Sequence, residues 1–155
     1  MIGPDSDDHM RLLQIRNFFA GQSWFDVSQY RLGLEGGTAM HWSRIPDIPL
    51  VALTWIFDLF MSYEQAEKWA ISIWPPLLSI AFVLGVWKAL KSVKGPYTKA
   101  FGLVLLAFIF VRFYRFSPGA IDHHNLQMVM LAIAIGFAID PLQRVRSSII
   151  AGIAC

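Results

Sequence analysis

The chain has 155 residues, of which 55% are hydrophobic and 15% are charged, and its formal net charge is +2. This small net charge, with basic residues that are not mixed with aromatic platforms, argues against a nucleic-acid-binding protein. The single cysteine, Cys155, excludes an internal disulfide and a cysteine-rich metal cluster.

The first feature along the chain is an acidic segment, "PDSDDHMR", at residues 4–11. One interpretation is a solvated acidic stretch, or the cap of a helix that begins near Met10, because aspartate is a favoured residue at helix N-termini. The other is that Asp5, Asp7 or Asp8 serves as a metal ligand. Both interpretations fit the residue types.

A short apolar segment, Ile48–Met61, follows Pro46 and contains Pro49. It has only fourteen residues and includes Asp58, whereas a membrane-spanning helix needs about 20 apolar residues. We therefore expect an interfacial or re-entrant helix that does not cross the bilayer, with Asp58 facing water. The alternative is a true span, which would invert the orientation of everything upstream.

Long runs without a charged side chain occupy much of the remaining chain. Runs of this kind, extended by flanking residues, are typical of membrane-spanning helices. They predict helices at Trp69–Trp87, Ala100–Arg112 and Asn125–Ile139. The expected fold class is all-α: a polytopic transmembrane helical bundle with interfacial helices in a long first external loop. We assign residues 1–68 to that loop and residues 69–155 to the membrane helices, with a second external loop near residues 115–124.

The basic residues predict how these helices are oriented. Four lysines crowd the loop "KALKSVKGPYTK", which contains no acidic residue, and Arg144 and Arg146 occupy another short loop. Short loops rich in lysine and arginine lie on the cytoplasmic side of membranes. The alternation of the helices then places Asp5 and Asp122 outside and Lys91 and Arg144 inside.

A second polar segment, "SPGAIDHHNLQ" at residues 117–127, lies between two apolar runs. Asp122 suits the N-terminal cap of the following helix, where its charge meets the positive end of the helix dipole. A cap does not explain two adjacent histidines at the edge of an apolar segment. A carboxylate and an imidazole are a credible pair of ligands for a divalent cation, and the acidic segment near the start offers a third from the same side.

Three motifs together resemble a known family. "PDSDDHMRL" keeps Asp5, His9 and Arg11 at the spacing of the acidic motif in the first external loop of oligosaccharyltransferase catalytic subunits. "GGTAMHWSRIPDIPL" resembles the later Gly…His-Trp…Pro stretch of that loop, and "GAIDHHNLQ" resembles the Gly-x-x-Asp-His-His motif of archaeal-type members. In order and in helix spacing, the chain resembles the N-terminal part of these GT-C fold membrane glycosyltransferases, of the archaeal or bacterial type.

The resemblance implies a metal site formed by Asp5, Asp122 and His124, with Asp5 and Asp122 as the catalytic residues. The ion would be Mn²⁺ or Mg²⁺, beside the phosphate groups of the sugar donor, where a Lewis acid stabilises the leaving group. Arg11 and Arg115 are candidates for binding these phosphates, although snorkelling at a helix end is the alternative for Arg115.

Three further residues would lie behind the ligands and orient them: His9, His123 and Gln127. Of these, we expect His123 to point away from the ion and to tolerate replacement by asparagine.

The implied function is a membrane glycosyltransferase. It would transfer a sugar or oligosaccharide from a polyprenyl-phosphate or diphosphate donor to an acceptor on the outer face of a bacterial or archaeal plasma membrane. Its partners would be the lipid-linked donor and membrane lipid, and no nucleic acid; the acceptor is left open. The family's first transmembrane helix would precede Met1, and later helices and a C-terminal domain would follow Cys155. We therefore expect these 155 residues alone to lack transferase activity.

The alternative is a non-catalytic transporter or membrane assembly subunit with polar external loops. A transporter should carry ionisable residues near the bilayer midplane. The apolar runs carry none, and the acidic and histidine residues gather at their ends, which favours the transferase.

Overall fold

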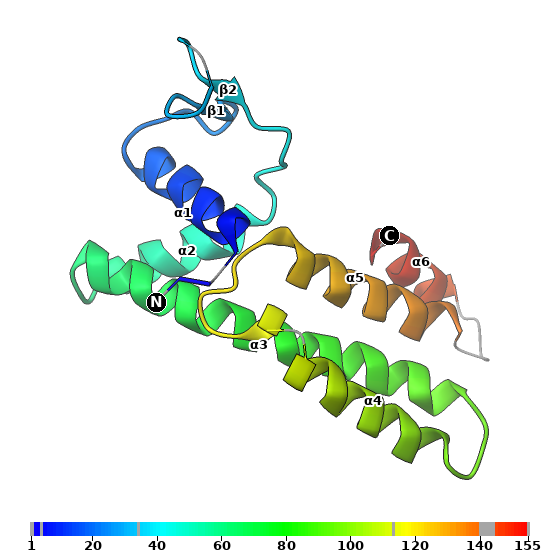
Figure 1. Ribbon diagram of the computed structural model, residues 1–155. Helices are drawn as coiled ribbons and strands as arrows, with labels where there is room; N and C mark the ends of the chain where they lie inside the picture. Colours follow the sequence, from blue (N-terminus) through cyan, green and yellow to red (C-terminus); the bar gives the residue numbers. More distant parts are fainter. Residues whose placement is uncertain (1, 4, 34, 113, 140–144, 155) are drawn as a thin grey trace.

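The computed structural model describes residues 2–3, 5–33, 35–112, 114–139 and 145–154. Within these ranges the chain is mostly helical, with one small antiparallel hairpin between β1 (Ser28–Gln29) and β2 (Thr38–Ala39) (Figure 1). The helices are α1 (Ser6–Phe19), α2 (Asp47–Asp58), α3 (Tyr63–Ser92), α4 (Thr98–Arg112), the 3-10 turn η1 (Tyr114–Phe116), α5 (His123–Ala138) and α6 (Val145–Ala154).

The longest element, α3, is the axis of the fold (Figure 1). Its 30 residues extend about 45 Å at 1.5 Å per residue. Within the described ranges it is the one helix that is long and apolar enough to cross a membrane. Pro75 and Pro76 lie inside it without ending it, so the carbonyl groups one turn earlier lose their helical donors.

The first two helices cover the N-terminal part of α3 (Figure 1). Arg16 of α1 binds the carboxylate of Glu67 on α3 with two hydrogen bonds, of 2.7 Å from Nε and 2.6 Å from Nη2. Glu67 is buried, so this two-pronged pair fixes α1 to α3. A small apolar core lies beneath, formed by Leu12, Ile15, Leu50, Ile71 and Ile121.

The C-terminal part of α3 packs on α4 and α5 (Figure 1). The closest approach is to α5, where a Cβ atom on Gly85 would lie 2.9 Å from the backbone of Ala132. A Cβ atom on Gly136 would lie 2.7 Å from the carbonyl oxygen of Gly85. The two glycines therefore let the backbones meet, as small residues do between membrane helices. The adjoining core contains Leu78, Phe82, Leu106, Phe116, Val129 and Ala132.

The three helices predicted from the apolar runs are all present as α3, α4 and α5. The expected boundary between the external loop and the membrane helices, at residues 68 and 69, falls inside α3. The helix begins earlier than expected and includes the buried Glu67, which binds Arg16. With 15 and 16 residues, α4 and α5 extend only about 22–24 Å, less than the roughly 30 Å of a hydrocarbon core. The structure therefore shows a mostly helical chain with one candidate span.

The expected interfacial segment, Ile48–Met61, contains all of α2 except its first residue, and α2 packs on α3. Its 12 residues extend about 18 Å, too short to cross a bilayer as an upright helix. Asp58 is exposed, as expected. The same end of the helix carries large exposed apolar side chains, namely Trp55, Ile56, Leu59 and Phe60.

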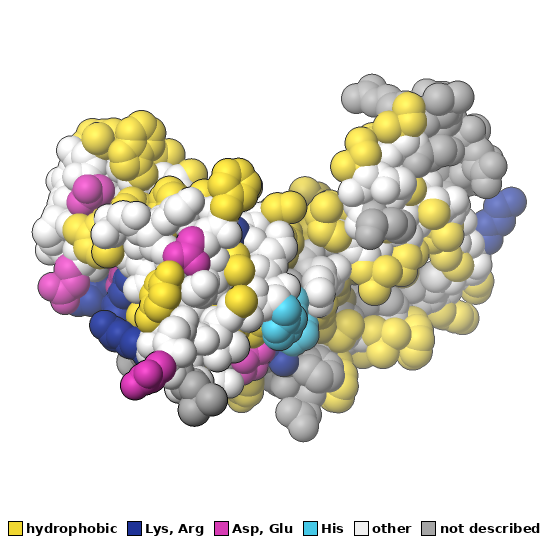
Figure 2. All heavy atoms as spheres, turned by 90° about the horizontal axis from the view of Figure 1, so that it is seen from above, with side chains coloured by type: hydrophobic (Ala, Val, Ile, Leu, Met, Phe, Trp, Pro, Cys, Tyr) yellow, Lys and Arg dark blue, Asp and Glu magenta, His cyan; other side chains and the backbone are white. Residues whose placement is uncertain are grey.

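The surface divides by chemical character (Figure 2). The part that contains α1 and the hairpin carries acidic and basic side chains, whereas hydrophobic side chains dominate the other end. Histidine side chains lie at the surface where the two parts meet. Many residues of the helices are exposed and apolar, among them Leu77, Ile80 and Leu84 of α3 and Phe101, Val104 and Phe108 of α4.

The glycine contact between α3 and α5 supports a stability prediction. Gly136→Val should lower the free energy of unfolding by about 1–3 kcal/mol, because the side chain would collide with backbone rather than with a mobile side chain. Gly152→Val is the matched control, since a Cβ atom on Gly152 of α6 meets no atom within 4 Å. Thermal unfolding in detergent, followed by circular dichroism, measures both. Equal shifts for the two variants would contradict the close packing.

Candidate metal centre

The two polar segments identified in the sequence meet in the structure. The buried carboxylate of Asp8 accepts hydrogen bonds from the backbone N–H groups of Ile121, at 2.7 Å, and Asp122, at 2.8 Å. The N–H of Gly3 donates to the carbonyl oxygen of Gly119 at 2.8 Å. The start of α1 and the loop before α5 therefore form one unit, although more than a hundred residues separate them in the chain.

Asp8 acts in this unit as a brace. Burial raises the pKa of its carboxyl, an effect that the N–H groups of Asp122 and Ile121 oppose. Since its Oδ1 atom already accepts both of these hydrogen bonds, Asp8 holds the loop in place. The sequence offers Asp5, Asp7 and Asp8 as a possible third ligand. In the structure, Asp8 has a structural role, which is to hold the loop before α5.

The prolines of α3 help to anchor the same loop. Pro75 has no N–H, so the carbonyl oxygen of Ile71, four residues earlier, lacks its usual helical donor. The N–H of Gly119 donates to that oxygen at 2.8 Å. Gly119 has a φ of 89°, which glycine adopts without strain. A helix-interior proline and a turn glycine together dock the loop on α3.

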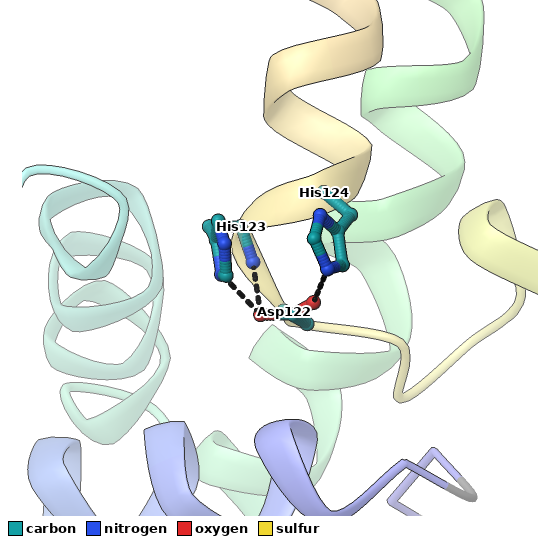
Figure 3. A group of neighbouring side chains, drawn as sticks. All are labelled: Asp122, His123 and His124. Carbon is teal, nitrogen blue, oxygen red and sulfur yellow. Dashed lines mark hydrogen bonds and ion pairs between the residues drawn. The ribbon is translucent and has the colours of Figure 1, made fainter. Parts of the chain in front are cut away.

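Asp122 is the N-cap of α5, and its Oδ1 atom accepts the N–H of His123 at 2.6 Å (Figure 3). The imidazoles of His123 and His124 flank its carboxylate (Figure 3). One ligand atom from each of the three residues lies within 4.8 Å of the other two. The expectation that His123 points away is therefore wrong: its Nδ1 atom contacts Asp122, because the helix start turns both rings toward the cap.

One carboxylate oxygen of this cluster lacks a hydrogen-bond partner among the described residues. Asp122 is 4% exposed, and its Oδ2 atom has no hydrogen-bond partner among the described residues. The atoms nearest to it that carry or can carry positive charge are His124 Nε2, at 3.4 Å, and Arg115 Nη1, at 3.9 Å. A buried carboxylate oxygen without a donor is unfavourable unless a cation or a proton satisfies it. One carboxylate and two imidazoles can therefore accommodate a transition-metal ion, and among Mn²⁺ and Mg²⁺ they favour Mn²⁺.

Two of the predicted supporting residues contact predicted ligands. His124 Nδ1 lies 3.2 Å from the amide oxygen of Gln127, one turn along α5. If Nδ1 donates to that oxygen, Nε2 is left unprotonated to bind an ion, which is the usual way a ligand histidine is oriented. His9 is farther back: its Nδ1 lies 3.0 Å from the backbone oxygen of Asp5.

Asp5 is the N-cap of α1 and reaches the cluster through Arg115. Its carboxylate accepts the N–H of Asp7 at 3.2 Å and a hydrogen bond from Arg115 Nη1 at 3.1 Å. The N–H of Asp7 is the main cause that lowers the pKa of Asp5, and Arg115 acts in the same direction. Asp5 therefore lies near Asp122, but the structure groups Asp122 with His123 and His124.

Arg11 has a different partner from the one that the sequence suggested. Its guanidinium is 1% exposed and bonds to the buried carboxylate of Asp47, at the start of α2. It also lies 5.3 Å from the ring centroid of Trp42. Burial raises the pKa of Asp47, and the charge of Arg11 opposes that effect. The guanidinium thus ties α1 to α2, and its phosphate-binding role stays a prediction.

A cavity of about 660 Å³ opens beside the cluster. His123 and His124 form one side of it, and Trp42 packs against His123 with ring centroids 5.8 Å apart. The remaining lining combines aromatic, polar and charged groups, namely Asp7, Arg11, His41, Ser43, Pro46, Leu126 and Gln127. Its volume is in the range of small-molecule sites.

Sequence reasoning missed two of the residues that build this region, Asp47 and Glu67. Each is a buried acidic residue whose arginine partner lies in α1. The available signal was that both occur in amphipathic or apolar stretches, where an acidic side chain needs a partner if it is buried. Arg144, which the sequence predicts on the inner side, lies outside what the structure describes.

Comparisons with protein-family models, curated proteins and solved structures find no match to this chain. The resemblance to oligosaccharyltransferase subunits therefore rests on the three motifs and their order alone.

Proposed function

We propose that this chain is the donor-binding part of a GT-C type membrane glycosyltransferase. In this proposal Asp122, His123 and His124 hold a divalent cation, Mn²⁺ in preference to Mg²⁺, at the outer face of a membrane. The substrate is a sugar carried on a polyprenyl phosphate or diphosphate. The observation that carries the proposal is the cluster itself, whose buried carboxylate oxygen has no hydrogen-bond partner among the described residues.

The cavity beside the cluster supports a sugar-phosphate ligand. It brings the faces of Trp42 and His123 next to polar groups, a combination that suits a sugar, whose faces are apolar and whose edges form hydrogen bonds. Arg115 is 38% exposed and lies within 4 Å of Asp122 Oδ2, so a phosphate at the ion would be within its reach. Guanidinium groups match phosphate geometry well.

The position of the cluster along α3 is compatible with α3 as a membrane-spanning helix. The loop that carries the cluster docks at Ile71, and Lys91 lies 20 residues farther along α3, which corresponds to about 30 Å. This separation is about the thickness of a hydrocarbon core. With the lysines at the cytoplasmic surface, the cluster would lie at the outer one.

Each group has a defined task in the proposed reaction. Bound divalent ions stabilise the negative charge that grows on a phosphate leaving group. Asp122 and the two imidazoles would hold the ion, and Gln127 would fix the orientation of His124. Asp8 keeps Asp122 at its place by binding its backbone N–H. Trp42 and the other cavity residues would position the sugar and exclude water from it.

The proposal is tested by binding, which does not require the complete reaction. The purified chain in detergent should show saturable Mn²⁺ binding, measured by the loss of the free-ion signal in electron paramagnetic resonance. A short polyprenyl phosphate should bind in the presence of Mn²⁺ and at least about tenfold more weakly in chelator, because its phosphate contacts the ion. Saturable Mn²⁺ binding without an effect on the lipid phosphate would contradict the donor role and favour a non-catalytic membrane subunit. Absence of Mn²⁺ binding would overturn the proposal.

A further inference from the structure

A basic side chain stands between the two acidic caps of the centre. Arg115 Nη1 is 3.1 Å from Asp5 Oδ2 and 3.9 Å from Asp122 Oδ2. These carboxylates cap different helices, α1 and α5, and the one guanidinium nitrogen lies within 4 Å of both. It therefore balances the charge of both caps.

The position of Arg115 bears directly on a metal ion at the centre. Asp122 Oδ2 is the buried oxygen that lacks a hydrogen-bond partner among the described residues, and His124 Nε2 faces it at 3.4 Å. An ion held by this oxygen and this nitrogen would bring its positive charge close to the guanidinium. Two positive charges at such a distance repel each other strongly where solvent is partly excluded.

We infer that Arg115 is a built-in counter-cation that the metal ion displaces, so that Arg115 and the ion exclude each other between Asp5 and Asp122. This inference rests on the proposed function, because it concerns the same ion. Without the ion, Arg115 holds the two carboxylates together. When the ion binds, the guanidinium moves off the two carboxylates, and Asp5 becomes free to join Asp122, His123 and His124 around the ion.

The structure allows this exchange. The side chain of Arg115 is 38% exposed, so it can change rotamer without disturbing a packed core. Asp5 caps α1 through Oδ1 and can keep that bond while its Oδ2 atom exchanges the arginine for the ion. Asp122 is fixed as the cap of α5 and by the brace from Asp8. The mobile partner is therefore the arginine, and the two capping carboxylates stay in place. A displaced guanidinium on η1 would remain beside the ion, where a phosphate group could bind it.

The exchange makes a prediction about ion affinity that a purely structural arginine does not. Arg115→Met should tighten Mn²⁺ binding by about three- to tenfold, since the ion no longer has to break the contact with Asp5. Arg115→Lys, which keeps the charge but loses the planar fork, should lie between Arg115→Met and the unmodified chain. If Arg115 instead maintained the site by positioning Asp5 and Asp122, Arg115→Met would weaken binding.

A double-mutant cycle separates exchange from simple electrostatic repulsion. Asp5→Asn should weaken Mn²⁺ binding more in the Arg115→Met background than in the unmodified chain, by a further factor of about three or more. In the unmodified chain, Asp5→Asn removes a ligand of the ion but also removes the contact with Arg115 that the ion must break, so the two effects partly cancel. In the Arg115→Met background there is no such contact, and only the loss of the ligand remains. Equal effects of Asp5→Asn in both backgrounds would overturn the exchange while leaving the metal site intact.

The same titrations distinguish failure of the exchange from failure of the proposed function. If the unmodified chain binds Mn²⁺ and Arg115→Met binds it with equal or lower affinity, the exchange alone is contradicted. Binding by both chains that is tighter after Arg115→Met supports the exchange. No binding by any of the variants, with circular dichroism showing that all are folded, contradicts both the metal centre and the exchange.

Discussion

Asp122→Asn is expected to weaken Mn²⁺ binding by at least about 100-fold, since even groups behind the ligands typically change metal affinity by 10–100-fold. Asparagine retains an oxygen that can accept the N–H of His123, so the cap of α5 survives. What it removes is the negative charge on Oδ2, the buried oxygen without a hydrogen-bond partner among the described residues. The thermal unfolding midpoint should change little.

Asp122→Ala is a less clean experiment, because Asp122 also caps α5 in the structure. Alanine should therefore lower stability by about 1 kcal/mol in addition to removing the ion. Asp58→Asn, an exposed carboxylate at the end of α2, is the matched control and should bind Mn²⁺ normally. Retention of the normal affinity by Asp122→Asn would exclude Asp122 as a ligand.

Arg11→Ala is expected to lower the free energy of unfolding by about 3–5 kcal/mol, the range for removing one partner of a buried ion pair. Arg11 is 1% exposed and Asp47 is 1% exposed, so alanine would leave a buried carboxylate without its cation. Asp47 already has one carboxylate oxygen without a hydrogen-bond partner among the described residues, which makes it poorly able to compensate. Chemical denaturation in detergent measures the loss.

The Arg11→Met/Asp47→Leu double variant is the control. Because it removes both charges and restores apolar volume, it should recover most of the stability that Arg11→Ala loses. Lys68→Ala is a second control, since its pair with Glu64 is exposed and should contribute little to stability. A loss below about 1 kcal/mol for Arg11→Ala would show that the guanidinium is not buried as described, and would favour its phosphate-binding role.

The sequence was sufficient to predict α2, α3, α4 and α5 as helices and to single out the two polar segments. Apolar runs such as those of α3, α4 and α5 satisfy their backbone groups as helices when they are in a bilayer, and "DHH" follows a Ser-Pro-Gly turn just before α5. The lengths of the helices were predicted less well. Side-chain polarity cannot show that Glu67 is buried, and so the start of α3 was placed in the preceding loop.

What only the tertiary structure decided is which side chain meets which. Asp5, Asp7 and Asp8 are equivalent as residue types, yet Asp8 braces the loop, Asp5 faces Arg115, and neither belongs to the described group around Asp122. The direction in which each of these carboxylates points depends on its position at the start of α1. The distance from each carboxylate to Asp122 depends on how α1 docks on α3. The sequence by itself determined that acidic and imidazole groups gather at the ends of apolar helices, because the cost of burying charge in an apolar run excludes them from its middle. Contacts across more than a hundred residues, such as that of Asp8 with Asp122, arise only when the helices pack and fix these ends relative to one another.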